Sequence, residues 1–258
     1  KIGGICMTEP NAGSDLMAIK TLAKVTEDGF ILNGQKTWVT SAPVADFFTV
    51  IARTDNHEQL SIFFVPANTK GVLVGKSIEK MGVRASVTSE VAFNDVKLPK
   101  NYLLGNIGEG TKCLKEILAE IRIMTAALAI GVATAAFEEA LKYANERTQF
   151  GKPIGKFQAV QLKFADMALQ LETARHYTLY AATLSDKNLP RQKEAMIAKL
   201  YASECAVNIC DEASRVLASY GYAVDYNIER YLRDSRFTLI GGGTSEILKI
   251  NIAKELGL

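Results

Sequence analysis

One stretch constrains the fold of this chain more than any other. Residues 109–147 contain no proline and, after Gly110 at their start, one glycine, and their middle, 123–137, is apolar nearly all round. A helix that is apolar on every side is buried on every side, so this stretch predicts a long central helix.

The residues before this helix have a different pattern. Residues 1–107 carry short apolar stretches separated by turn formers such as Asp28-Gly29. Asn33-Gly34 is typical of a two-residue hairpin turn, which predicts a new strand at Lys36–Thr40. Short strands at this spacing predict an antiparallel β-barrel or sandwich.

The residues after this boundary, 108–258, predict a helical domain. A second helix is expected from about Gly155, a third from about Arg191 to Ser219, and a last one capped by Thr244-Ser245. Three long helices and one shorter one predict an up-down four-helix bundle. The fold class is therefore α+β, with a β-rich domain at 1–107 followed by a helical bundle.

Composition excludes several classes of function. Lys and Arg number 30 against 28 Asp and Glu in 258 residues, which leaves a net charge of +2 and no electrostatic case for nucleic acid. No uninterrupted run of strongly apolar residues is long enough for a membrane span. The chain has two histidines, so hydrolysis centred on histidine is not favoured.

The four cysteines give no sign of a metal site or a disulfide. They stand at 6, 113, 205 and 210, with no Cys-x-x-Cys pair and no neighbouring histidine. A reducing compartment is the simplest interpretation, which predicts the cytoplasm, or the mitochondrial matrix in a eukaryote.

Five motifs, each weak alone, occur in a specific order. The loop Thr8-Glu-Pro-Asn-Ala-Gly-Ser-Asp15 can present backbone N–H groups and hydroxyls to an anion or a polar ring edge. A glycine run, Gly241–Gly243, opens the last helix, where the backbone can approach a ligand closely. Together with Asn33-Gly-Gln-Lys-Thr-Trp-Val-Thr40, Glu146-Arg-Thr-Gln-Phe-Gly-Lys-Pro-Ile154 and Glu229-Arg-Tyr-Leu-Arg-Asp-Ser-Arg236, these motifs resemble the acyl-CoA dehydrogenase family over essentially the whole chain.

The resemblance implies FAD as the cofactor. The positions that would line it are Ile5, Met7, Thr8, Ser14, Trp38, Val39, Thr40, Thr244 and Glu246. Arg147, Phe150 and Gln158 match positions that reach the FAD of a neighbouring subunit, which implies a homodimer or homotetramer. Ser14, Arg122 and Gly243 match positions near the acyl-CoA thioester. The family also has an N-terminal helical domain, which we expect to precede this chain.

The catalytic base departs from the family pattern. The commonest base is a Glu just before Gly-Thr-x-x-Ile, where this chain has Gly242, and some members place it at the position of Ile121. Glu120 is the nearest carboxylate, but one residue turns it about 100° around the helix. The alternatives are Glu120 as the base, a solvated or paired Glu120, or a base supplied upstream of this chain.

A second departure precedes Tyr220. Family members usually have Gln-x-x-Gly-Gly there, against the FAD of the partner subunit, and this chain has Arg215-Val-Leu-Ala-Ser219. Arg215 could pair with a cofactor phosphate. Ala218 and Ser219 add side chains where the backbone of family members approaches the cofactor, so this edge of the site could also be weaker or absent.

The resemblance implies a FAD-dependent α,β-dehydrogenation of an acyl-CoA thioester, with hydride transfer to the flavin and electron-transfer flavoprotein as the acceptor. Two alternatives stay open at this point. One is a non-catalytic FAD-binding or structural subunit. The other is a reductase or specialised family member whose base lies elsewhere.

Overall fold

The computed structural model describes residues 1–54 and 57–258, with the side chains of 57–59 left out. It divides into two compact units. The β unit comprises residues 1–80 and 84–115, and the helical unit comprises 81–83 and 116–258. Helix α1 contributes its first turns to the β unit and the rest to the helical unit.

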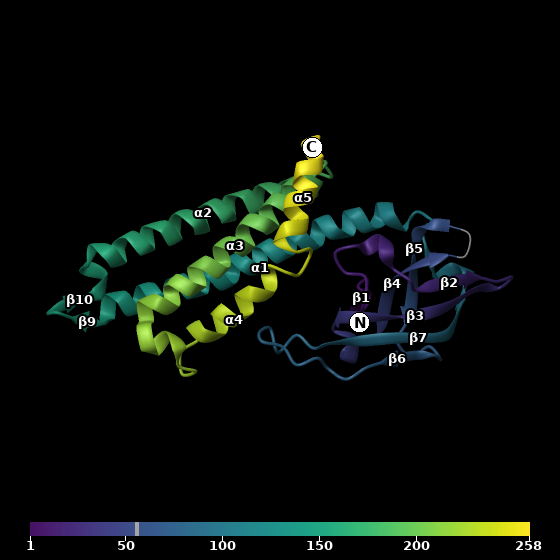
Figure 1. Cartoon of the computed structure of the whole chain (residues 1–258), viewed down its shortest axis with the longest axis horizontal. Helices are drawn as coiled ribbons and strands as arrows, with labels where there is room; N and C mark the ends of the chain where they lie inside the picture. The colour runs from purple at the N-terminus through teal and green to yellow at the C-terminus, as the bar shows by residue number, and fades with distance from the viewer. Residues whose placement is uncertain (55–56) are drawn as a thin grey trace. The chain divides into compact units, whose positions relative to one another are not determined.

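The β unit contains one eight-stranded sheet (Figure 1). Its strands follow the order β6-β7-β3-β2-β4-β5-β8, and β1 pairs with β4 off this path. Most pairs are antiparallel, but β1 and β2 both run parallel to β4. The strands are β1 (Gly3–Cys6), β2 (Leu22–Val25), β3 (Gly29–Thr40), β4 (Phe47–Thr54), β5 (His57–Pro66), β6 (Val72–Val74), β7 (Thr88–Pro99) and β8 (Leu103–Leu104).

The predicted hairpin at Asn33-Gly34 is wrong. These residues lie inside the continuous strand β3, at a register shift against β7, and the chain turns instead at Asp28-Gly29 before β3. The glycine serves close packing, because a Cβ on Gly34 would stand 2.4 Å from Thr21 Oγ1. An Asn-Gly pair marks a turn or a bulge, and only tertiary contacts decide between them.

Aromatic side chains fill the core of the β unit. Phe48, Phe63 and Phe93 have no exposed surface, and the rings of Phe30 and Phe63 meet edge to face with centroids 5.0 Å apart. Burying each such ring contributes about 1.5–3 kcal/mol. This core holds β1 and β3 in place, and these strands carry or adjoin the candidate site residues of the β unit.

The helical unit has three long helices that run lengthwise together and two short ones (Figure 1). Among the described residues the helical unit therefore has five α-helices, one more than the sequence predicts. The additional helix is formed by residues 228–238, for which we predicted a motif but no helix. The helices are α1 (Gly110–Glu146), α2 (Gln158–Asp186), α3 (Gln192–Leu217), α4 (Ile228–Thr238) and α5 (Ser245–Glu255). A two-stranded hairpin, β9 (Thr148–Gln149) with β10 (Lys152–Pro153), joins α1 to α2.

Alanines on α1 form the contact surface of the long helices. Ala119, Ala126, Ala133 and Ala140 recur every seven residues, and all are buried. Of the helices in the described part of the chain, α1 is the one long and apolar enough to cross a bilayer by length and composition. Its alanine face packs against α2 and α3 residues, as a central core helix does.

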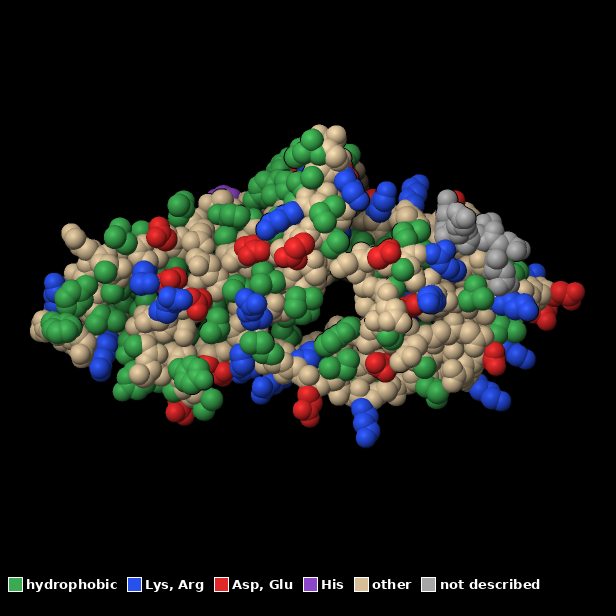
Figure 2. Space-filling model, in the orientation of Figure 1, with side chains coloured by type: hydrophobic (Ala, Val, Ile, Leu, Met, Phe, Trp, Pro, Cys, Tyr) green, Lys and Arg blue, Asp and Glu red, His purple; other side chains and the backbone are tan. Residues whose placement is uncertain are grey.

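Acidic and basic side chains are interspersed on the face of the molecule in Figure 2, and neither unit shows a broad patch of one sign there. This distribution agrees with the small net charge of +2.

Candidate functional site

The candidate residues fall on both units, and each set is described within its own unit. In the β unit, a buried ion pair that the sequence did not single out holds the loop after β1. Lys36 Nζ donates to Glu9 Oε1 at 2.9 Å and to Met7 O at 3.0 Å. The backbone N–H groups of Lys20 and Thr21 donate to the same carboxylate at 2.7 and 2.9 Å. Because loss of one partner would strand a buried charge, the pair fixes the loop.

The protonation of this pair follows from its contacts. Burial lowers the pKa of Lys36, and contacts with Glu9 oppose that shift. Burial also disfavours the Glu9 anion, but the hydrogen bonds that it accepts keep the pKa of Glu9 below its usual value. Glu9 is therefore an anion at neutral pH.

Beside this loop, the indole of Trp38 stands free of the core. The register of β3 against β7 shifts between Lys36 and Val39, and Trp38 has a left-handed φ of 57°. Such a bulge re-aims a side chain, and Trp38 is 57% exposed. Thr37 N donates to Thr8 O at 2.9 Å, which places the loop against the bulge. The fold thus brings Thr8 and Trp38 together.

The other predicted flavin residues of the β unit divide by exposure. Ile5, Ser14 and Thr40 are exposed and Met7 is half-buried. A Cβ on Gly4 would lie 3.4 Å from Thr40 O, so β1 and the end of β3 are adjacent. Val39 is 1% exposed with its side chain in the core, so only its backbone is available to a ligand.

In the helical unit, the two positions where family members place the base are neighbours. A Cβ on Gly242 would lie 3.6 Å from Ile121 Cγ2 and from Thr125 Oγ1, and 3.7 Å from Arg122 Cγ. These are ordinary contact distances, although φ at Gly242 is +74°. The structure therefore brings both base positions to one place, and neither carries a carboxylate.

Two buried cations converge on the glycine turn at this place. Arg122 Nε donates to Gly242 O at 3.2 Å, and Lys199 Nζ donates to Gly243 O at 2.6 Å. Arg122 is 8% exposed and Lys199 is fully buried. Burial lowers the pKa of Arg122, and burial together with Arg122 lowers the pKa of Lys199 to about 8, while Glu204 and Glu246 oppose that shift. Among the described residues neither cation forms an ion pair with a carboxylate.

The start of α5 is capped as the sequence predicts. Thr244 Oγ1 accepts a hydrogen bond from Ile247 N at 3.4 Å. Ser245 Oγ donates to Glu204 Oε1 at 2.6 Å. Glu246 is exposed, and its own backbone N–H and Thr244 lower the pKa of its carboxyl. Polar groups of α3 and α5 thus surround the turn.

The geometry does not favour Glu120 as the base. Its Oε1 accepts from Ser185 Oγ at 2.6 Å and from Arg191 Nε at 2.8 Å. These contacts lower the pKa of Glu120, which makes its carboxylate a weaker base. Glu120 is therefore a paired carboxylate, which is one of the alternatives that the sequence leaves open. Among the described residues, no hydrogen bond joins Glu120 to Arg122 or Gly242.

Arg147, Phe150 and Gln158 lie on the surface around the β9–β10 hairpin. Phe150 is 93% exposed at the tip with a left-handed φ of 51°, and its ring meets Phe157 edge to face at 6.1 Å. Arg147 and Gln158 are also exposed. Within the described part of this chain nothing covers the tip.

The segment Arg215–Ser219 differs from what a phosphate site needs. Arg215 Nε donates to Asp211 Oδ2 at 2.7 Å, so its charge already has a partner within α3. Ala218 has φ 53° and ψ −127°, a conformation typical of glycine, and Ser219 is exposed beside it. These observations weaken the prediction that Arg215 binds a cofactor phosphate.

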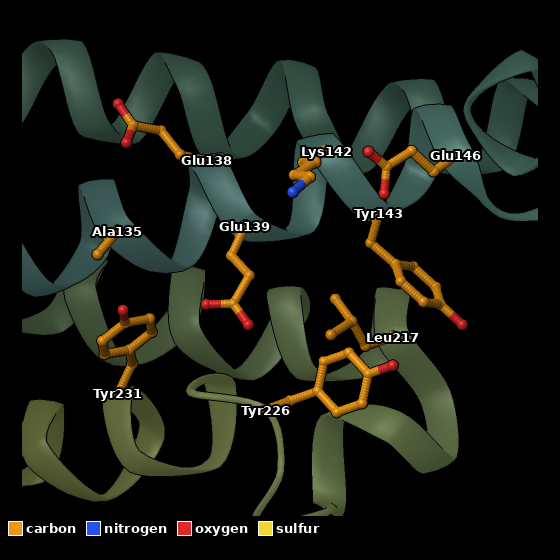
Figure 3. Close-up of a pocket in the computed structure, with 9 residues that line it drawn as sticks. All are labelled: Ala135, Glu138, Glu139, Lys142, Tyr143, Glu146, Leu217, Tyr226 and Tyr231. Carbon is orange, nitrogen blue, oxygen red and sulfur yellow. The ribbon is translucent and has the colours of Figure 1, made fainter.

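A pocket next to this segment lies away from the glycine turn. It is lined by residues 135–146 of α1, Leu217, Tyr226 and Tyr231, and Glu139 points into it (Figure 3). Along α1 it is roughly 25 Å from Arg122 at 1.5 Å per residue. No group of three or more potential metal ligands occurs in the described ranges, so the structure offers no metal centre there.

Lys199 is a buried lysine at the glycine turn that the sequence motifs do not single out. It stands on the α3 face that also carries Ala195, Ala202 and Ala206, all of them buried. Lysine is rarely buried, so its place at helical spacing among small apolar residues is the sequence signal that could have identified it.

Comparison with known proteins identifies both units. Residues 4–96 match the acyl-CoA dehydrogenase middle domain, and residues 108–257 match the acyl-CoA dehydrogenase C-terminal domain. The chain is 59% identical to benzylmalonyl-CoA dehydrogenase of Aromatoleum aromaticum, over 99% of this chain and 68% of the relative.

Solved structures agree. Butyryl-CoA dehydrogenase of Megasphaera elsdenii has a TM-score of 0.97 and 38% identity, over 100% of this chain and 68% of that one. PigA with FAD and proline has a TM-score of 0.96 and 32% identity, over 99% of this chain and 68% of that one. The chain thus spans about two thirds of the length of these relatives.

Proposed function

Since this chain belongs to the acyl-CoA dehydrogenase family, we propose that it oxidises an acyl-CoA thioester that carries a second carboxylate on C2, and that loss of this carboxylate as CO₂ replaces removal of the α-proton. The fold and the family make it an acyl-CoA dehydrogenase-type flavoprotein. The observation that carries the finer proposal is the pair Gly242 and Ile121, which leaves both family base positions without a carboxylate.

The residues of the β unit fit FAD. An exposed indole on a bulge gives a flat apolar surface. Thr8, whose carbonyl accepts a hydrogen bond from Thr37 N, and Thr40, two residues after Trp38, carry hydroxyls that can bond polar ring edges. We propose that Ile5, Met7, Thr8, Ser14, Trp38, the backbone of Val39, and Thr40 hold the cofactor, with Thr244 and Glu246 of the helical unit. Bound FAD supplies the hydride acceptor.

A carboxylated substrate removes the need for a base. A benzylmalonyl thioester, the substrate in the relative's name, has a carboxylate on the carbon next to the thioester carbonyl. When the C2–carboxylate bond breaks, its electron pair forms the C2=C3 bond as hydride leaves C3. The products are CO₂ and a 2,3-unsaturated thioester, so atoms and charge balance without a proton acceptor.

The chain's own residues have two tasks in this scheme. We propose that Arg122, Gly243 and Ser14 orient the thioester, as the family resemblance implies. Positive charge at the glycine turn also favours the negative charge that develops on the thioester oxygen as CO₂ departs. Neither task needs Glu120, for which we propose a structural role between α1, α2 and α3.

The assembly and the acceptor are also proposals. The exposed tip with Arg147, Phe150 and Gln158 supports a homo-oligomer in which it reaches the FAD of a second copy, a state that light scattering would reveal. Electron-transfer flavoprotein is the proposed acceptor. The cytoplasm or the mitochondrial matrix remains the predicted location.

Two matched thioesters test the proposed reaction. Benzylmalonyl-CoA and 3-phenylpropionyl-CoA differ only in the C2 carboxylate, and each is added anaerobically to the FAD-loaded protein. The flavin band should bleach with the first and at least about 100-fold more slowly with the second, because a general base contributes roughly 10²–10⁴-fold. Equal bleaching by both would refute the proposal, and bound FAD with no bleaching by either would favour the non-catalytic alternative.

A further inference from the structure

Helix α2 has two seams of regularly spaced residues, one on its inner side and one on its outer side. Figure 1 shows α2 along one side of the helical unit, with α3 next to it. The inner seam is buried in the core of this unit at steps of four and three residues: Met167, Leu171, Ala174, Thr178 and Ala181. The outer seam has the same spacing, and all its members are exposed: Leu162, Asp166, Leu169, Thr173, His176, Tyr180 and Thr183. Steps of three and four residues are the heptad spacing by which one helix packs against another.

The outer seam is apolar where an ordinary exposed helix face is polar. Leu162 is 67% exposed and Leu169 is 68% exposed. A single exposed leucine needs no explanation, but two leucines seven residues apart lie on one line of the helix, and Tyr180 continues that line. A surface hollow lies at the far end of the line, and its lining residues are Glu172, Thr173, His176, Tyr177 and Tyr180. The seam thus offers both a protruding apolar side chain and a place to receive one.

Asp166 and His176 are the two members of the outer seam that can carry a charge. Among the described residues, Asp166 forms no hydrogen bond or ion pair. His176 Nδ1 lies 2.7 Å from Glu172 O, so it donates within α2 and leaves Nε2 for another partner. The two residues are roughly 15 Å apart along the helix, so they cannot meet within one chain.

A second α2 helix that runs antiparallel would bring these groups together. A twofold axis beside residue 171 makes every contact occur twice, because residue i of one copy meets residue j of the other and the reverse. The pairs are then Leu162 with Tyr180, Asp166 with His176, and Leu169 with Thr173. A shift of the helices by one heptad sets Asp166 against Leu169 or Thr183 instead. The opposite charges therefore favour one register over its neighbours.

We propose that the outer seam of α2 is a twofold interface with a second copy of this chain, in which His176 donates to the partner's Asp166 and Leu162 packs on the partner's Tyr180. The interface rests on the proposed homo-oligomer and adds a second surface to the β9–β10 tip. The middle of the seam is roughly 20 Å along α2 from Gln158, so the two surfaces are separate. Two separate twofold interfaces on each copy build a tetramer.

The mass of the assembly tests the seam independently of the tip. Leu169→Lys puts a cation into the seam from both copies, and it should weaken this contact at least roughly 100-fold, because two leucines lose their burial. Light scattering at micromolar concentration should show the FAD-loaded protein as a tetramer and the variant as a dimer with unchanged FAD content. The matched control Leu73→Lys, at an exposed leucine on β6, should leave the mass unchanged. A mass that Leu169→Lys does not change overturns the interface, whether the seam is then bare or covered by another protein, and leaves the proposed reaction untouched.

Exchange of the two charged residues tests the register. His176→Asp sets two carboxylates against each other and should weaken association roughly 10–100-fold, the worth of a hydrogen bond to a charged group. Asp166→His combined with His176→Asp should restore the tetramer, which requires a second copy because the two positions cannot meet in one chain. Thermal unfolding shows whether each variant is folded, and if Leu169→Lys is not, the exposed substitution His176→Asp decides. A double variant that stays as dissociated as His176→Asp overturns the proposed pairing.

Discussion

Placing a carboxylate at residue 242 should make the protein oxidise 3-phenylpropionyl-CoA in place of benzylmalonyl-CoA. In Gly242→Glu the new side chain enters the space beside Ile121, Arg122 and Thr125, where a Cβ meets nothing closer than 3.6 Å. The carboxylate would stand beside the Arg122 side chain. It would supply a base and, by like charge, exclude the second carboxylate of the substrate.

The magnitude of each effect follows from the structure. The φ of +74° at residue 242 makes a non-glycine side chain unfavourable by roughly 1–2 kcal/mol. That corresponds to a fall in Tm of about 2–8 °C for a protein of this size. Oxidation of 3-phenylpropionyl-CoA should rise by roughly 10²-fold or more, because the base is restored.

Stopped-flow reduction of the flavin with each of the two thioesters measures this exchange. Gly242→Gln has the same backbone strain and nearly the same volume without the charge, so it should lose stability like Gly242→Glu but gain no oxidation of 3-phenylpropionyl-CoA. If Gly242→Glu is folded and still reduces its flavin faster with benzylmalonyl-CoA, the reasoning about position 242 is wrong.

Three further predictions concern stability and cofactor retention. Lys36→Met should leave the buried Glu9 carboxylate unpaired, destabilise the protein by about 3–5 kcal/mol and cause loss of FAD. Calorimetry and flavin absorbance measure these effects, and a stable variant with full FAD content would contradict the anchoring role of the ion pair. Ala218→Gly should stabilise the protein by roughly 1 kcal/mol, because its φ of 53° and ψ of −127° suit glycine, and an unchanged or lower Tm would argue against strain there. Glu120→Gln should leave flavin bleaching by benzylmalonyl-CoA unchanged. It should lower stability by less than about 1 kcal/mol, because the pair with Arg191 is partly exposed. Loss of bleaching in a folded variant would instead indicate that Glu120 acts in the reaction.

The sequence predicted those helices and helix ends that are determined by residues only a few positions apart. The apolar run at 123–137 gave a central helix, and Thr244 gave a helix start, because periodicity and capping are visible within a few residues. Asn33-Gly34 was misread because a contact with Thr21, distant in sequence, decides between a turn and a bulge. Helix α4 was not predicted as an element because it is short, 11 residues, and most of them are polar or charged.

The candidate site could be predicted only in part for the same reason. The exposed Trp38 and the loop at Thr8 follow from motifs that stand together in the sequence, although the bulge that joins them does not. The meeting of Gly242 with Ile121 depends on how α1 packs beside the turn before α5. The convergence of Lys199 and Arg122 requires two helices whose relative rotation no local pattern sets.

The most direct test of the central claim counts CO₂ in a single turnover. Benzylmalonyl-CoA labelled with ¹³C in its free carboxyl group is mixed anaerobically with the FAD-loaded protein, and labelled CO₂ is measured against flavin reduced. Loss of the carboxylate in place of the α-proton predicts one labelled CO₂ for each flavin reduced, released at the rate of bleaching. Flavin reduction without labelled CO₂, or with CO₂ released only later, would contradict it.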